Sequence, residues 1–344
     1  MKNRFYRLVK PGVFRVDDDV LSTPYGAVVV RPTYLSICAA DQRYWSGRRD
    51  PEALRKKLPM ALVHEAVGTV YEDPAGIFAI GTPVVMVPNF PDSNEKDTFA
   101  KENYALGSRF ASSSADGFMQ DYVTLPAHRL VKCNDVGPLT AVLSEPVSVC
   151  IGAYESFRAH RSVRPSGTIG IWGDGTTGYL LASLIAKCEP NATLEIFGTH
   201  DDKLARFDFV HATHNIRKDF KRALPQVDHA FECVGGTAGC ASAINQIIDC
   251  IRPQGVVNLM GISEQPVPIN TRKVLEKGLT IQGNKRSSRR DFVRAIEYLA
   301  DPEFSVRVSS VVRRVVPVKN IDDMQKAFEL DEVNSFKTVM QWEI

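Results

Sequence analysis

The chain has 344 residues, 44% of them hydrophobic and 24% charged, which is an ordinary composition for a folded protein and argues against disorder. Its 42 basic and 40 acidic residues are mixed along the chain, so the net charge of +2 excludes a global field that would attract nucleic acid or a membrane surface. The length is sufficient for two domains, each with its own core.

No uninterrupted apolar run reaches the ~20 residues that a membrane-spanning helix needs. The N-terminus leads into polar sequence without the apolar core of a signal peptide. The seven cysteines stand at irregular spacings, which is not the pattern of a disulfide framework. We therefore expect a cytoplasmic protein whose partners include neither nucleic acid nor a membrane.

The first 150 residues contain short β-branched runs separated by proline and glycine, as in 26–32 and 81–88, with little helical periodicity. This pattern predicts a mainly β domain over residues 1–150. From residue 147 the pattern changes to a helical stretch that ends at about residue 160, followed by strands alternating with helices. The predicted strands lie at 168–172, 193–197, 229–233, 256–260 and 280–283, and helices run through 187, from 201 and around 241–252.

Strands that alternate with helices indicate a parallel, doubly wound sheet, which we assign to residues 151–288. A basic cluster, a helix near 291–299 and a strand at 337–342 follow. Because the predicted sheet closes near residue 284, we expect the segment 289–344 to return to the first domain.

A glycine-rich turn, Gly173-Asp174-Gly175-Thr176-Thr177-Gly178, stands between a predicted strand and a predicted helix. Gly173 allows the tight bend, Gly175 lets the backbone approach a pyrophosphate, and Gly178 permits close packing of the helix on the strand. The helix N-terminus at Thr176 and Thr177 offers free N–H groups to the phosphates. A plain glycine-rich turn is the alternative, but the repeated βα context favours a dinucleotide site.

The second strand of the predicted sheet ends at Gly198, where NAD enzymes usually place an acid on the ribose hydroxyls. With no carboxylate at that position, we favour NADP over NAD. The residues that can contact a 2′-phosphate there are Gly198, Thr199, His200, Lys203 and Arg206. The alternative, that Asp201 or Asp202 reaches back to the ribose, remains open.

Three separate segments carry side chains of the types that bind zinc: Cys38, the pair His64-Glu65, and Glu145. Sulfur, imidazole nitrogen and carboxylate oxygen are the usual zinc ligands, and a catalytic site keeps one position open. His64 and Glu65 stand in apolar, strand-like sequence, where two ionisable groups are costly without a partner. These residues therefore predict a catalytic zinc site.

The order of these motifs resembles the medium-chain dehydrogenase/reductase superfamily over essentially the whole chain. The motifs are Cys38-x-x-Asp41, Pro59-x-x-x-x-His64-Glu65-x-x-Gly68, Glu145-Pro146 and the glycine-rich turn. The resemblance implies an α/β fold with a GroES-like, mainly β catalytic domain and a Rossmann doubly wound parallel sheet. It also implies that Cys38, His64 and Glu65 hold the zinc, that Glu145 is a mobile ligand or water partner, and that Asp41 orients the ligands.

The sequence departs from the superfamily's pattern at four places. Ala39-Ala40 replaces the usual Gly-Ser/Thr after the cysteine, so the hydroxyl that often starts the proton relay is missing. Arg43 replaces a histidine, and Val63 replaces the glycine before His64. The lobe at about 89–109, which commonly holds a structural zinc on four cysteines, contains none. We therefore expect one catalytic zinc per chain and no structural zinc.

Basic residues near the predicted site suggest an anionic substrate. Arg43 lies close to Cys38 in sequence, and the cluster Lys285-Arg286-x-x-Arg289-Arg290 follows the last predicted sheet strand. Arginine binds two phosphate oxygens at once, so we assign Arg43 and Arg286 to a substrate phosphate. A solvated basic turn is the alternative for the cluster and remains open.

The segments 35–44, 63–65 and 144–149 are similar to those of bacterial ribulose-5-phosphate reductases. This resemblance implies NADPH-dependent reduction of D-ribulose 5-phosphate to D-ribitol 5-phosphate, a homodimer or homotetramer, and a cytidylyltransferase as pathway partner that makes CDP-ribitol for teichoic acid or capsule. An NAD-dependent polyol dehydrogenase that acts on unphosphorylated sugar alcohols is the second hypothesis. A zinc-free nucleotide-binding regulator is the third.

Overall fold

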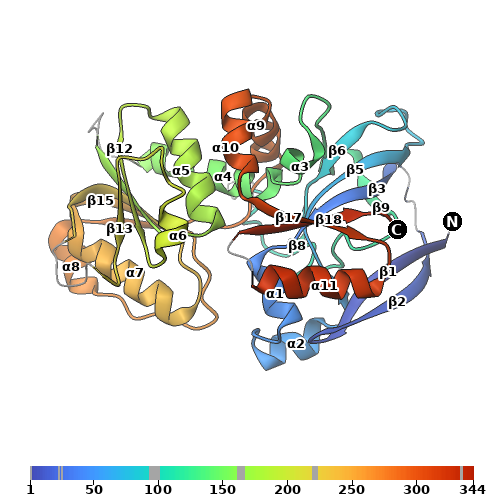
Figure 1. Ribbon diagram of the computed structural model, residues 1–344, viewed down its shortest axis with the longest axis horizontal. Coiled ribbons are helices and arrows are strands. Elements are labelled where there is room, and N and C mark those ends of the chain that lie inside the picture. Colours follow the sequence, from blue (N-terminus) through green and yellow to red (C-terminus); the bar gives the residue numbers. More distant parts are fainter. Residues whose placement is uncertain are drawn as a thin grey trace. The chain divides into compact units, whose positions relative to one another are not determined.

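The computed structural model describes residues 2–21, 24, 26–92, 101–160, 167–218, 224–333 and 336–344. Contacts divide the chain into two compact units, which are drawn in Figure 1. The first unit comprises Met1–Ser148 and Arg286–Ile344, and the second comprises Val149–Lys285. Within the lobe that was expected to lack a structural zinc, residues 93–100 lie outside the described residues.

The first unit is mainly β, as predicted. Its strands are β1 (Lys2–Lys10), β2 (Val13–Val20), β3 (Ala27–Ser36), β4 (Met60–Ala61), β5 (Glu65–Glu72), β6 (Pro83–Met86), β7 (Asn89–Phe90), β8 (Arg109–Phe110), β9 (Val123–Pro126), β10 (Leu130–Lys132), β17 (Val312–Val318) and β18 (Lys337–Trp342). The largest sheet has the order β10-β6-β5-β3-β18-β17, with β9 also paired to β3. Two smaller sheets, β2-β1-β4 and β7-β8, complete the unit. The central strand β3 therefore lies between β5 and β18, and its end leads to Cys38.

Helices separate the strands of this unit along the chain. They are α1 (Ala39–Trp45), α2 (Pro51–Lys57), η1 (Ala127–Arg129), α3 (Pro138–Ala141), α9 (Arg289–Leu299), α10 (Pro302–Ser309) and α11 (Ile321–Glu332). In Figure 1, α11 lies beside α1, and it also contacts β17 and β18. Phe328 of α11 packs against Phe14 and Trp45, with ring centroids 5.4 Å and 5.3 Å away. The C-terminal segment thus belongs to the core of the first unit.

The second unit contains a six-stranded sheet in which every neighbouring pair is parallel. Its elements are β11 (Thr168–Trp172), α5 (Thr176–Cys188), β12 (Thr193–Gly198), α6 (Asp201–Leu204), β13 (Ala212–Asn215), β14 (Val227–Glu232), α7 (Thr237–Cys250), β15 (Ile251–Leu259), α8 (Thr271–Lys277) and β16 (Thr280–Gly283), and α4 (Ser144–His160) leads into them. The strand order β13-β12-β11-β14-β15-β16 reverses direction beside β11. This order confirms the predicted Rossmann doubly wound sheet, in which ligands bind beyond the carboxyl ends of the strands.

Two elements of this unit differ from the prediction. The helix expected from Asp201 ends after one turn, because the chain then bends and packs Phe207 and Phe209 against Tyr179. Strand β13 was not predicted. It is an edge strand with no fully buried residue, so it lacks the apolar run that marks a central parallel strand.

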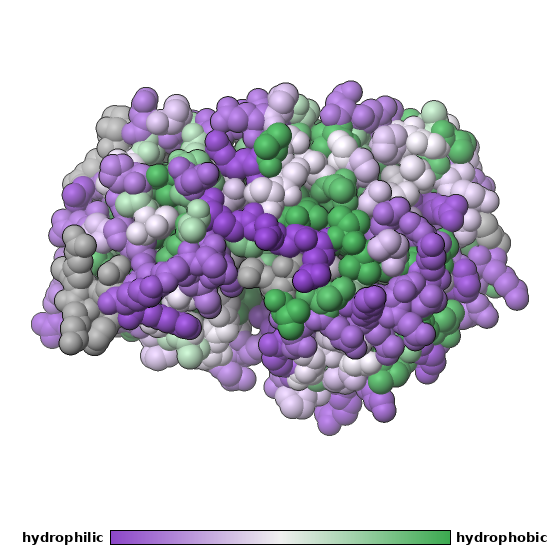
Figure 2. Space-filling model, in the orientation of Figure 1, coloured by the Kyte–Doolittle hydropathy of each residue, from purple (hydrophilic) through white to green (hydrophobic). Residues whose placement is uncertain are grey.

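No helix of the described residues is long and apolar enough to cross a membrane. On the face drawn in Figure 2, hydrophilic residues predominate, and hydrophobic residues form small groups between them. Such a surface is normal for a folded protein in water, because apolar atoms also contribute much of the accessible area.

Candidate active site

Cys38 follows the end of β3 and caps the N-terminus of α1. Its Sγ accepts a hydrogen bond from the backbone N–H of Ala40 at 3.3 Å. Its own N–H donates to Oδ2 of Asp41 at 3.1 Å, which completes a reciprocal capping arrangement. The start of the helix therefore orients the thiol and the Asp41 carboxylate together.

Strand pairing brings His64 and Glu65 to the same place. In the antiparallel pair of β3 and β5, Ser36 lies opposite Glu65, so the start of β5 stands beside the end of β3. The Sγ of Cys38 lies 3.5 Å from Nε2 of His64. One ligand atom from each of Cys38, His64 and Glu65 lies within 4.8 Å of the others. The structure thus brings together three of the four residues expected to bind the metal.

Asp41 supports this group from behind. Its carboxylate is fully buried, and Oδ1 accepts a hydrogen bond from the backbone N–H of Val63 at 3.0 Å. Nδ1 of His64 lies 3.8 Å from the same oxygen. A carboxylate at the second nitrogen of a ligand histidine sets its tautomer and ring orientation. Asp41 therefore accepts hydrogen bonds from the backbone of Cys38 and from that of Val63, the residue before His64.

Lys337 was not predicted to be part of the site. It is buried at the first position of β18, where Nζ donates to Oε1 of Glu65 at 2.5 Å and to the carbonyl of Ile37 at 3.2 Å. Burial lowers the pKa of Lys337, but Glu65 and Cys38 raise it, and the net pKa lies above its ordinary value. The sequence signal was a lysine at the first position of a predicted strand.

The arrangement fits a zinc ion. Within the described part of the chain, Oε2 of Glu65 is buried without a hydrogen-bond partner. Burial raises the pKa of the Cys38 thiol well above its ordinary value, and Asp41 and Glu65 raise it further. A buried group of sulfur, nitrogen and oxygen donors that includes an unpaired carboxylate oxygen is stabilised when a cation binds between them.

Glu145, the fourth expected residue, lies in the first turn of α4 and is buried, but it is not a member of the close group. Its pKa rises to about 7. Burial is the main cause, the charge of His64 opposes it, and that of Glu65 adds to it. Glu145 is therefore a neighbour of the group rather than one of its three adjacent donors.

Arg286 lies near the same group through an aromatic ring. Its guanidinium carbon stands 4.5 Å from the ring centroid of Phe110, and that ring meets the imidazole of His64 edge-on at 5.2 Å. Among the described residues, Arg286 makes no ion pair or hydrogen bond, and burial lowers its pKa. Arg43, the other basic residue assigned to a phosphate, lies half-buried in α1. Of the basic cluster, Arg286 is half-buried, whereas Arg289 and Arg290 are exposed.

In the second unit, the glycine-rich turn has the geometry that its motif requires. Gly173 adopts a φ of 129°, and a Cβ there would lie 2.9 Å from the carbonyl oxygen of Cys233. A Cβ on Gly178 would overlap the carbonyl oxygen of Gly173, so only glycine allows α5 to pack this closely on the turn. A Cβ on Gly175 would meet nothing within 4 Å, which leaves open space beside the backbone. Thr176 and Thr177 begin α5.

The last residue of β12 is Gly198, as expected, but a carboxylate that was not predicted extends to the same place from Asp174 of the glycine-rich turn. Its Oδ2 accepts hydrogen bonds from the backbone N–H groups of Thr199 at 2.7 Å and His200 at 2.9 Å, and Nδ1 of His200 lies 3.1 Å away. Burial raises the pKa of Asp174, but these hydrogen bonds outweigh it, and the net pKa lies below its ordinary value. A Cβ on Gly198 would stand 2.6 Å from Cβ of Asp174, so glycine at this position makes room for the Asp174 side chain.

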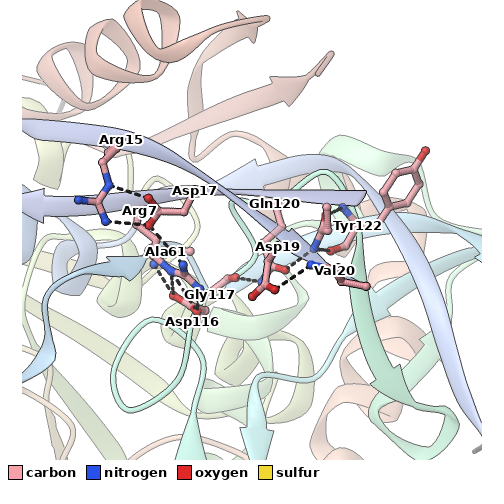
Figure 3. A network of polar contacts seen from close by, with 11 residues as sticks. Arg7, Arg15, Asp17, Asp19, Val20, Ala61, Asp116, Gly117, Gln120 and Tyr122 are labelled. Carbon is pink, nitrogen blue, oxygen red and sulfur yellow. Dashed lines mark hydrogen bonds and ion pairs between the residues drawn. The ribbon is translucent and has the colours of Figure 1, made fainter. Parts of the chain in front are cut away.

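Hydrogen bonds and an ion pair of Asp116 hold the segment that leads into His64. Figure 3 shows Asp116 between Arg7 and Ala61: Oδ2 pairs with the guanidinium of Arg7 at 2.7 Å, and Oδ1 accepts the N–H of Ala61 at 2.8 Å. The next residue, Gly117, donates its N–H to the carbonyl of Ala61 at 2.7 Å. The backbone of 116–117 thus lies directly against 61–63.

We expect Gly117→Ala to lower the free energy of unfolding by about 3 kcal/mol, because the new Cβ would overlap the carbonyl oxygens of Leu62 and Val63. Urea denaturation measures this change. Gly283→Ala is the matched control, since a Cβ there meets nothing within 4 Å, and we expect it to change stability by less than about 0.5 kcal/mol. Equal free energies of unfolding for the two variants would show that the backbone of residues 61–63 can shift to make room for the Cβ without loss of stability.

Known proteins place the chain in a family. Two family models match: the alcohol dehydrogenase GroES-like domain over residues 24–135, and the glucose dehydrogenase C-terminus over residues 139–342. The ribulose-5-phosphate reductase of Bacillus spizizenii is 46% identical, and ribulose-5-phosphate reductase 2 of Staphylococcus aureus is 45% identical, each over 100% of both chains. The crystal structure of S. aureus TarJ in complex with NADPH has a TM-score of 0.86 and 40% identity over 100% of both chains.

Both halves of the chain match dehydrogenase models, and the curated relatives match it from end to end. The resemblance seen in the order of the motifs is thereby confirmed. The chain belongs to the medium-chain dehydrogenase/reductase superfamily and, within it, to the family of the ribulose-5-phosphate reductases.

Proposed function

We propose that the protein reduces D-ribulose 5-phosphate with NADPH to D-ribitol 5-phosphate. The observation that carries this proposal is the close group of Cys38, His64 and Glu65 in a chain that matches ribulose-5-phosphate reductases over its full length. The product would be activated by a cytidylyltransferase to CDP-ribitol for teichoic acid or capsule. We further propose that the enzyme works in the cytoplasm as a homodimer or homotetramer.

In this proposal, Cys38, His64 and Glu65 hold one zinc ion, with Glu145 as a further ligand or water partner. When bound, zinc supplies a Lewis acid that polarises the substrate carbonyl and stabilises the negative charge that develops on it. Lys337 holds Oε1 of Glu65, and Oε2, which has no hydrogen-bond partner among the described residues, would be available to bind the ion. Since Ala40 offers no hydroxyl, Glu145 is the buried carboxyl that we assign to passing a proton to the product.

NADPH would lie along the glycine-rich turn of the second unit and supply the hydride from its nicotinamide. The residues assigned to it are Gly173, Gly175, Thr176, Thr177, Gly178, Gly198, Thr199, His200 and Lys203. The open space at Gly175 and the free N–H groups at the start of α5 suit a pyrophosphate. The Asp174 carboxylate at the end of β12 would repel a 2′-phosphate. Thr199 and His200 already contact this carboxylate through three polar atoms, and Lys203 would supply positive charge to the phosphate.

We expect Lys203→Ala to raise the KM for NADPH about tenfold and to leave the KM for NADH unchanged, because a hydrogen bond from a cation to phosphate contributes about 1.5 kcal/mol at an accessible position. Steady-state rates with each cofactor measure this split. Lys218→Ala is the control, since that lysine pairs with Asp201. An equal change in both KM values would contradict the assignment of Lys203 to the 2′-phosphate.

The substrate phosphate is assigned to Arg286, with Arg43 as a second candidate. Arg286 has a half-buried guanidinium that makes no ion pair among the described residues. It contacts Phe110, which in turn contacts His64, so it is suited to bind an anionic group of the substrate. In D-ribulose 5-phosphate, three carbons and one ester oxygen separate the carbonyl carbon from phosphorus. In this proposal the carbonyl lies at the zinc ligands and the phosphate at Arg286.

The proposal is tested by initial rates of cofactor oxidation with D-ribulose 5-phosphate, D-ribulose and fructose, each with NADPH and with NADH, before and after zinc removal. We expect fast turnover only with the phosphorylated ketose and NADPH, and loss of that turnover on chelation with recovery when zinc returns. Turnover of the unphosphorylated sugars at a similar rate would instead identify a polyol dehydrogenase. Cofactor binding without turnover of any sugar would identify a nucleotide-binding regulator.

A further inference from the structure

We propose that Ser112 is a positioning residue for the metal site. Its hydroxyl holds the Asp41 carboxylate, which in turn fixes the segments that carry Cys38 and His64. This inference rests on the zinc site of the proposed function, and it concerns a residue that the sequence motifs do not mark.

The contacts of Asp41 make Ser112 part of a connected set. The hydroxyl of Ser112 donates to Oδ1 of Asp41 at 2.5 Å, and both side chains are buried. The same oxygen accepts the N–H of Val63, while Oδ2 accepts the N–H of Cys38. A buried carboxylate depends on its donors, because water cannot replace them. Ser112 supplies the one side-chain hydroxyl among them.

Backbone strain at the two donors to Oδ1 supports a positioning role. Val63 has a φ of 66° and Ser112 a φ of 57°, both in the left-handed region. This conformation is unfavourable for an L-residue, and it is rarest for a β-branched side chain such as valine. Strained residues persist where surrounding contacts hold them, and they gather at functional sites. Here one carboxylate oxygen binds both strained residues, and Val63 directly precedes His64.

The segment of Ser112 also touches the site a second way. Phe110, two residues earlier, packs its ring against the imidazole of His64 at 5.2 Å. The turn at 110–115 is closed by hydrogen bonds from the N–H groups of Ser113, Ser114 and Ala115 to the carbonyl of Phe110. One closed turn therefore contacts His64 through a ring and Asp41 through a hydroxyl. Without the hydroxyl, Oδ1 of Asp41 loses one of its donors, and the carboxylate is held less firmly beside His64.

The test is zinc affinity, measured by competition with a chromogenic chelator in the absence of substrate. We expect Ser112→Ala and Ser112→Gly each to bind zinc about tenfold more weakly than the wild type, the lower end of the effect of losing a supporting contact in metal sites. Ser112→Gly separates the hydroxyl from the backbone, because glycine adopts the left-handed conformation without strain. Its melting temperature should therefore equal or exceed that of Ser112→Ala while its zinc affinity falls.

Ser113→Ala is the matched control, since the Ser113 side chain makes no hydrogen bond within the described part of the chain. It should bind zinc like the wild type. In the cobalt-substituted protein, the thiolate charge-transfer band should shift in Ser112→Gly and not in Ser113→Ala, because Asp41 also holds the N–H of Cys38.

Equal zinc affinity of Ser112→Gly and Ser113→Ala would overturn the positioning role alone. A folded wild type that retains no zinc would overturn both this inference and the proposed metal site. A wild type that binds zinc tightly and shows the Ser112 effect, yet does not reduce D-ribulose 5-phosphate, would support the inference and contradict only the proposed substrate.

Discussion

Cys38→Ala is expected to lower the rate of D-ribulose 5-phosphate reduction about a thousandfold, because losing a zinc ligand removes several kcal/mol of charge stabilisation in the transition state. The Cys38 thiol is one of three donors within 4.8 Å, so two donors cannot replace it. NADPH binding should remain, since the glycine-rich turn belongs to the other compact unit. Steady-state rates, bound zinc per chain and calorimetric titration with NADPH measure the three quantities.

Cys133→Ala is the matched control for this variant. Cys133 is a buried cysteine of the same unit, and burial raises its pKa to about 12, so it is an unreactive thiol. We expect this change to leave zinc content and turnover unchanged. A well-folded Cys38→Ala protein that no longer binds NADPH would contradict the assignment of metal and nucleotide to separate units.

Arg286→Gln should lower kcat/KM for D-ribulose 5-phosphate about 100-fold and leave the much slower turnover of D-ribulose unaffected. A desolvated charge pair is worth about 2–5 kcal/mol when one partner is removed, and glutamine keeps a polar chain without the charge. Arginine and glutamine are equally strained by the left-handed backbone at position 286, so this strain does not distinguish the variant from the wild type. The ratio of the two kcat/KM values isolates the contribution of the substrate phosphate.

Arg290→Ala supplies the comparison, because that arginine belongs to the same basic cluster but is exposed. It should leave kcat/KM unchanged for both D-ribulose 5-phosphate and D-ribulose, since an exposed charge is screened by water and salt. If Arg290→Ala lowers kcat/KM as much as Arg286→Gln does, the cluster acts through its summed charge. In that case the position of Arg286 over Phe110 carries no specificity.

Local sequence patterns were sufficient to predict most of the strands and helices of the second unit. The observed strand Thr168–Trp172 has the predicted bounds, because an apolar run that ends at a glycine-rich turn needs no distant partner to be recognised. The C-terminal strand Lys337–Trp342 was likewise predicted with its observed bounds. The elements between Pro302 and Glu332 were missed. In α11, the buried positions Met324, Ala327 and Phe328 follow helical spacing, so the signal was present but short.

The sequence alone determined the fold class and the kinds of side chain available for zinc and nucleotide chemistry, because ligand type and hydrophobic period are local properties of the chain. Only the tertiary structure decided which of those side chains meet. Pairing of β3 with β5 and β18 brings together Cys38, Glu65 and Lys337. Lys337 is 272 residues away from Glu65 in the sequence. Contacts over such separations depend on strand register and burial, so no local pattern could place Lys337 on Glu65 or Asp174 at the end of β12.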